Sequence, residues 1–125
     1  MNATKEISFE GDHVRAVSIG QKSIETSRKL WTEIVQVCKE HQCYRVLGIA
    51  NTTKAMPIID GIDHVSLFRE LGINTKYRIA WVEQNAAAMK SVKFIDAALF
   101  NRMLPGRIFS EEDEAKTWLF GSKGY

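Results

Sequence analysis

Residues 44–50 read YRVLGIA and residues 77–82 read YRIAWV, and the segment that begins and ends with these two runs decides the fold. The first run is mostly apolar on both faces, as expected for a central strand that helices cover. Between the runs, apolar residues recur at helical spacing, at Ile58, Ile62, Val65, Phe68 and Leu71. Pro57 suits the first turn of this helix and Gly72 its C-terminal cap. A strand, a helix and a strand in this order predict a parallel, right-handed crossover.

Upstream of this unit, the pattern predicts a hairpin and a helix. The runs Ile7–Phe9 and Val14–Ile19 flank a turn around Gly11, which is typical of a β-hairpin. From the N-cap candidate Ser23 the period becomes helical, and residues 40–42 are a candidate frayed end. The apolar side of this helix is expected to carry Ile24, Trp31, Ile34, Val35 and Cys38.

Downstream, we expect a helix over residues 84–102, a short strand at Arg107–Phe109 and a last helix. Ser110 and Asp113 resemble a capping box that opens the last helix, and residues 121–125 are expected to form a loose tail. The predicted order is β-β-α-β-α-β-α-β-α within one domain over residues 1–125. This is an α/β fold with a mixed four- to five-stranded sheet and about four helices.

Composition excludes several classes of function. The chain of 125 residues has 17 Lys and Arg against 15 Asp and Glu, and this balance does not favour nucleic-acid binding. No stretch approaches the ~20 apolar residues that span a bilayer, and residues 1–10 lack the apolar run of a signal peptide. We therefore expect a cytoplasmic protein without stable membrane insertion. Cys38 and Cys43 match no zinc pattern and are expected to be free thiols, with Cys38 packed under its helix.

Catalytic signatures are also missing. The sequence contains no GxSxG, no P-loop and no dinucleotide GxGxxG motif. Its three histidines form no HxxxH or HExxH pair, so neither a metal nor another cofactor is expected. Asp60 and His64 are four residues apart and would share a helix face, where they could serve acid–base chemistry, although such a pair is more often only solvated.

The loop after the first central strand is the main candidate site. Asn51, Thr52, Thr53 and Lys54 lie between a buried strand and a helix N-terminus, where backbone N–H groups and the helix dipole favour an anion. The alternative is that these residues only end the strand and cap the helix. Trp31, Trp81 and Trp118 fit either core positions or the wall of an apolar pocket.

The layout resembles the SpoIIAA-like branch of the STAS superfamily. The resemblance is carried by the N-terminal hairpin, by both central strands and above all by the ending RIFSEEDEAKTWL at residues 107–119. It implies a bacterial, non-enzymatic switch that binds a protein partner, with phosphorylation of a serine after the central strand in the anti-sigma-factor antagonists. Here that loop reads ANTTK at residues 50–54, so the resemblance transfers the modification only to Thr52 or Thr53.

Three functional hypotheses follow, and a homodimer is compatible with each. The first is a regulatory module whose partner binds near residues 51–62. The second is a carrier or sensor of a small apolar or lipid-like ligand, comparable with Sec14-type domains. The third, ranked last, is an enzyme that uses Asp60, Asp63 and His64. Large side chains that could contact the partner or ligand are Met56, Ile58, Ile62, Phe68, Trp81, Met89 and Phe94.

Overall fold

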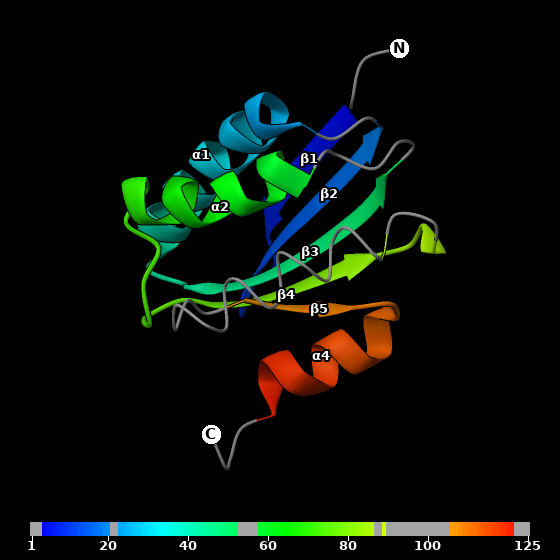
Figure 1. Ribbon diagram of the computed structural model, residues 1–125. Coiled ribbons are helices and arrows are strands. Elements are labelled where there is room, and N and C mark those ends of the chain that lie inside the picture. The colour runs from blue at the N-terminus through cyan, green and yellow to red at the C-terminus, as the bar shows by residue number, and fades with distance from the viewer. Residues whose placement is uncertain (1–3, 21–22, 53–57, 87–88, 90–105, 122–125) are drawn as a thin grey trace.

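The five strands lie side by side in the order in which they occur in the chain (Figure 1). The computed structural model describes residues 4–20, 23–52, 58–86, 89 and 106–121. β1 runs antiparallel to β2, and every later pair of neighbours is parallel, so the predicted mixed sheet and its parallel central unit are confirmed. The strands are β1 (Thr4–Phe9), β2 (Val14–Gly20), β3 (Arg45–Thr52), β4 (Arg78–Glu83) and β5 (Gly106–Phe109).

Helices cover both faces of the sheet. α1 (Ile24–His41) and α2 (Ile58–Glu70) lie on one face, and α4 (Glu112–Phe120) lies on the other (Figure 1). The part of the chain that is described therefore holds three helices where about four were expected. Most of the predicted helix over residues 84–102 lies outside the described residues, as do Pro57 and the tail at 122–125.

Local signals set the ends of several elements. In the hairpin, Gly11 has φ of 96° and the Glu10 N–H donates to the His13 carbonyl at 2.8 Å, as the turn prediction requires. Ser23 caps α1 as predicted: its Oγ accepts from the Thr26 N–H, and the Thr26 hydroxyl accepts from the Ser23 N–H. Gly72, with φ of 78°, follows α2 in a Schellman arrangement and confirms the predicted cap.

Two predicted helix ends are wrong. α1 does not fray at residues 40–42, because Gln42 adopts a left-handed conformation and the Cys43 N–H donates to the Cys38 carbonyl at 3.0 Å. α4 has Glu111 as its N-cap, one residue after the predicted Ser110, and no side chain caps it through a hydrogen bond. The acidic first turn of α4 instead interacts favourably with the helix dipole.

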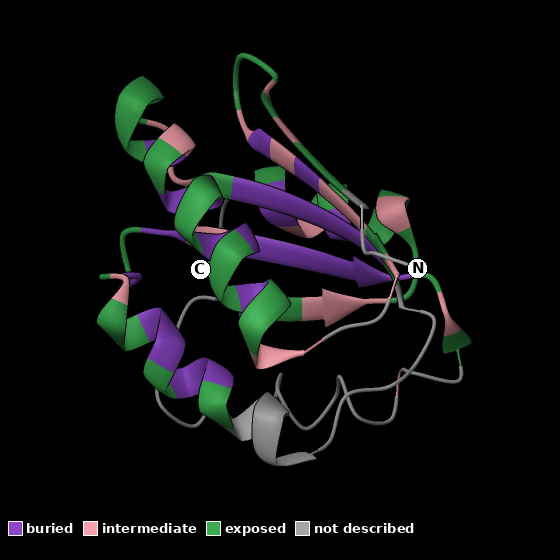
Figure 2. Cartoon of the chain, turned by 90° about the horizontal axis from the view of Figure 1, so that it is seen from above, coloured by how far each residue is buried: buried purple, intermediate pink, exposed green. Residues whose placement is uncertain are grey.

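The sheet separates two hydrophobic cores. The larger core lies under α1 and α2, and the smaller core lies under α4. Figure 2 shows that the central strands are buried, whereas the helices expose their outer sides. The smaller core consists of Leu47, Ile49, Ala80, Val82, Ala115 and Leu119.

Gly48 permits a close contact within the larger core. Gly48 and Trp81 are Cα partners on β3 and β4. A Cβ atom placed on Gly48 would lie 2.0 Å from Cε3 of the Trp81 ring, so only glycine leaves room for the indole. The Trp81 ring in turn lies 5.4 Å from that of Trp31, which makes a ring contact with Phe68 at 4.7 Å.

Candidate functional site

The carboxyl-terminal edge of the parallel strands carries an exposed apolar residue beside the predicted loop. Ile19 on β2 is the Cα partner of Asn51 on β3, so both side chains project from the same face, the one that α4 partly covers. Asn51 is exposed, and 48% of Ile19 is exposed. Among the described residues, Phe120 is the only other large apolar side chain that is comparably exposed.

An acidic hollow opens at the same edge. It has a volume of about 290 Å³ and lies between the end of β4 and the start of α4. Val82 and Gln84 line one side, and Glu111, Glu112 and Asp113 line the other together with Ser110. We call Ile19, Asn51 and this hollow the carboxyl edge, which combines an apolar contact point with negative charge.

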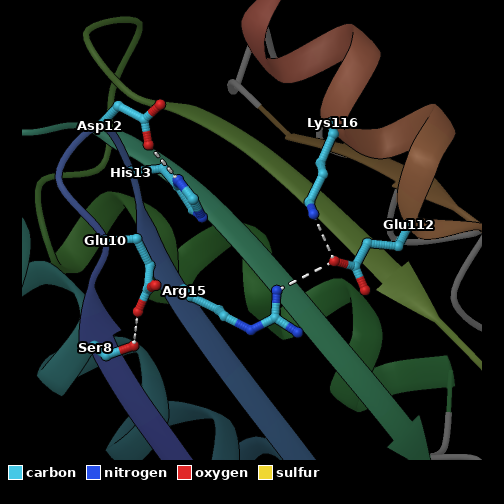
Figure 3. A network of polar contacts seen from close by, with 7 residues as sticks. All are labelled: Ser8, Glu10, Asp12, His13, Arg15, Glu112 and Lys116. Carbon is cyan, nitrogen blue, oxygen red and sulfur yellow. Dashed lines mark hydrogen bonds and ion pairs between the residues drawn. The ribbon is translucent and has the colours of Figure 1, made fainter.

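A salt bridge from β2 anchors α4 beside the hollow, and a second one lies within the helix. Glu112 accepts from Arg15 of β2 at 3.2 Å and from Lys116 at 3.0 Å (Figure 3). The hydrogen bond from Lys116, followed by that from Arg15, lowers the pKa of Glu112 below its ordinary value. Glu112 therefore stays charged in the hollow.

A second set of polar contacts surrounds the hairpin turn. The His13 ring meets the Asp12 carboxylate at 2.7 Å, and the Ser8 hydroxyl donates to Glu10 at 2.6 Å (Figure 3). The hydrogen bond with His13 is the main reason that the pKa of Asp12 is lowered. These contacts order the hairpin at the end of the sheet opposite the carboxyl edge.

A buried carboxylate ends β4. Glu83 is 1% exposed, and its Oε2 accepts from the Asn85 N–H at 3.1 Å. Its Cα partner Ala50 belongs to the larger core, so Glu83 lies on the face opposite Asn51. This carboxylate positions the chain as it leaves β4.

Among the other predicted site residues, the structure describes the side chains of Phe68, Trp81 and Met89, and none of these three is exposed. Phe68 and Trp81 are 3% and 4% exposed, because both belong to the larger core around Trp31. Of the two alternatives for the tryptophans, Trp31 and Trp81 take core positions. Neither Phe68 nor Trp81 offers a surface to a docked protein. Met89 is half-buried. Thr53, Lys54, Met56 and Phe94 lie outside the described residues, as do the side chains of Thr52, Ile58 and Ile62.

The interpretation of His64 as one of a solvated pair is wrong. His64 is 3% exposed, and its Nε2 lies 2.8 Å from the Oγ of Ser27, which is 1% exposed. The side chain of Asp60 lies outside the described residues. A serine and a histidine at this distance can act as nucleophile and base, but here both are sealed between α1 and α2. The pair is a buried polar contact between two helices, and the spacing of His64 alone does not reveal its partner on α1.

The two cysteines are free, as predicted. Cys38 is buried under α1, and burial raises the pKa of its thiol to about 12, with a smaller contribution from Cys43. Cys43 is half-buried. No group of three or more His, Cys, Asp or Glu side chains in the described part of the chain could hold a metal ion. The described helices include none that is long and apolar enough to cross a membrane.

Comparison with solved structures identifies the fold. An anti-sigma factor antagonist from Mycobacterium paratuberculosis superposes with a TM-score of 0.63 over 94% of both chains, at 8% sequence identity. A protein of the DUF3478 family with a SpoIIAA-like fold, from Shewanella loihica, gives a TM-score of 0.56 at 13% identity, over 94% of this chain and 93% of its own. No family model and no curated protein matches the sequence. The chain thus has the SpoIIAA-like fold, as the resemblance in the sequence implied.

Proposed function

We propose that this protein is a non-enzymatic regulatory module that binds a partner protein through its carboxyl edge. The observation that carries the proposal is the exposed pair Ile19 and Asn51 at the same edge of the sheet as the acidic hollow. An exposed aliphatic side chain next to charged groups is a common arrangement at the centre and rim of a protein interface. The likeness to an anti-sigma factor antagonist supports a switch that acts by binding.

The acidic side chains of the hollow indicate which kind of partner surface would bind this edge. Glu111, Glu112 and Asp113 line the hollow, and Lys116 and Arg15 both contact the single carboxylate of Glu112. Glu111 and Asp113 are exposed. A partner with an apolar residue for Ile19 and lysines or arginines for these acids is therefore favoured, since complementary charge speeds encounter and selects orientation.

The predicted switch residues, Thr52 and Thr53, come directly after Asn51 of the carboxyl edge in the sequence. Thr52 ends β3 directly after Asn51, and Thr53 follows it in the sequence. A phosphate on either threonine would add a charge of about −1.5 to −2 to this edge. We propose that such a modification changes the affinity for the partner.

The test is a capture experiment with matched variants. Tagged wild-type protein is recovered from its own host, and the bound partner is identified and then titrated against purified variants. Ile19→Asp and Glu111→Lys should each weaken binding at least about tenfold, because both change the proposed contact surface. Intact-mass analysis of the recovered protein tests for the phosphate on Thr52 or Thr53.

Two control variants make the same kinds of substitution outside the carboxyl edge. Phe120→Asp introduces the same charge at an exposed apolar residue near the start of β3, where Phe120 contacts Arg45, and Glu114→Lys reverses an exposed charge on α4 outside the hollow. Both controls should bind like the wild type. If Ile19→Asp and Glu111→Lys bind as tightly as these controls, the carboxyl edge is not the interface.

A further inference from the structure

A second and larger hollow lies at the opposite edge of the sheet, where the parallel strands begin. Its volume is about 610 Å³, within the range of small-molecule sites, and it opens to solvent on one side. Three separate segments line it: residues 9, 11 and 12 around the hairpin turn, residues 41–45 between α1 and β3, and residues 75–78 at the entry to β4. We call it the amino-edge hollow.

Aromatic rings supply its apolar surface. The rings of Tyr44 and Tyr77 meet edge to face with centroids 5.0 Å apart. On another side, the rings of Phe9 and His41 stack with centroids 4.1 Å apart. Tyr77 is 5% exposed and supports Tyr44 from within the larger core. The half-buried rings of Tyr44 and Phe9 and the exposed ring of His41 supply the surface that a planar group can contact.

The charges that face the hollow are mainly positive. Arg45, Lys76 and Arg78 line it against one carboxylate, that of Asp12, which already contacts His13. The Lys76 ammonium lies 4.3 Å from the centroid of the Tyr44 ring, so a cation and an aromatic surface occur together. Within the described chain, neither Lys76 nor Arg45 forms an ion pair with a carboxylate.

The framework of the hollow is held in place. Arg78 donates two hydrogen bonds to the Trp118 carbonyl, at 2.7 and 3.2 Å, and its guanidinium lies 3.9 Å from the centroid of the Trp118 ring. The Arg78 N–H donates to the Tyr44 carbonyl at 2.8 Å, which joins two of the lining segments. At the C-terminus of α1, the N–H groups of Gln42 and Cys43 donate to the carbonyls of Lys39 and Cys38. These bonds offset part of the negative charge at this end of the helix dipole, which would otherwise repel an anion.

We propose that the amino-edge hollow binds a small organic anion with a planar ring, whose ring contacts the Tyr44 surface and whose carboxylate or phosphate reaches Lys76 and Arg45. This inference is independent of the partner-binding proposal, because the hollow and the carboxyl edge share no residue. The anionic group remains partly in water at the open side, where both long cations reach it.

Titration followed by amide chemical shifts tests the proposal with four defined probes. Phenyl phosphate and benzoate carry both features, inorganic phosphate has the charge alone, and benzyl alcohol has the ring alone. At least one of the first two should shift amides of residues 41–45 and 75–78 saturably and bind about tenfold tighter than either single-feature probe. The tighter of the two identifies the anionic group. Equal affinity for all four probes, no response, or shifts only outside the hollow would overturn the proposal.

Variants and thiol chemistry give independent readouts. Combined Arg45→Ala and Lys76→Ala should weaken the binding of the better probe about tenfold, whereas Lys29→Ala on the exposed side of α1 should leave it unchanged. At ten times its Kd the probe should also slow alkylation of Cys43, which lines the hollow, about tenfold. Buried Cys38 reports any unfolding. Unchanged affinity in the double variant, or unchanged alkylation of Cys43, contradicts this placement of the ligand.

Discussion

The two faces of the sheet are packed in different ways. On one face, α1 and α2 together cover the larger core, and the rings of Trp31, Phe68 and Trp81 contact one another. On the other face, α4 has only nine residues and covers a smaller, mainly aliphatic core. Part of its attachment is polar, through Arg78 and the Trp118 carbonyl and through Arg15 and Glu112.

We therefore expect the two layers to contribute unequally to the stability of the domain. Buried apolar area is the main source of stability, so the layer under α1 and α2 should unfold only with the whole molecule. α4 buries less and should open at a lower free energy.

Gly48→Ala should produce the largest loss. The added methyl group would overlap the Trp81 ring, and such overpacking in a central strand is expected to lower the unfolding free energy by about 3 kcal/mol. Alanine loses less conformational freedom on folding than glycine, which raises the unfolding free energy by ~0.5–1 kcal/mol. The overpacking is therefore the larger effect. Urea denaturation measures the change.

A double-mutant cycle provides the control for Gly48. In a Trp81→Leu background the ring is absent, so Gly48→Ala should cost less than about 1 kcal/mol there. Equal costs in both backgrounds would show that the contact between Gly48 and Trp81 does not limit this position.

Leu119→Ala should have an intermediate and more local effect. Leu119 is 1% exposed in the smaller core, and its truncation is expected to cost about 2–3 kcal/mol. Hydrogen exchange should show protection lost mainly in α4, while the amides of α1 keep most of theirs. Equal loss of protection in both helices would mean that the two layers unfold as one unit.

The salt bridges of Glu112 should give the smallest effect. Because the pKa of Glu112 is lower in the folded than in the unfolded chain, its contribution is complete above the ordinary value of 4.5 and is lost as the pH falls through the folded-state pKa. Between pH 7 and pH 3, the wild type should therefore lose more unfolding free energy than Glu112→Gln, and the difference should be less than about 1 kcal/mol. Glu114→Gln, at an exposed position of α4, is the control, and an equal change in both variants would contradict the assignment.

Most of the fold could be predicted because its signals are local. The alternation around Val14–Ile19, the helical period after Ser23 and the glycines at 11 and 72 each indicate an element or its end, and the structure confirms them. The start of α4 was missed by one residue, because Ser110 has favourable cap chemistry but the backbone turns only at Glu111. Local sequence preference does not determine that position.

The contacts that define the candidate sites were less predictable. Asn51 was expected in the loop after the first central strand, but β3 continues through Thr52, and the pairing of Asn51 with Ile19 depends on the register between β2 and β3. The same limit applies to Gly48 under Trp81 and to Ser27 beside His64, which are far apart in the sequence. The amino-edge hollow combines three distant segments, so no single motif indicates it.

The strand order has a consequence for how the chain is made. Because β1 to β5 occupy the sheet in chain order, each strand that leaves the ribosome finds its neighbour already synthesised. The sheet can grow by addition at one edge, without waiting for a distant segment to insert between two strands. α4 is the last described element to emerge, and until it docks, the β3–β4 surface that it covers stays open to chaperones.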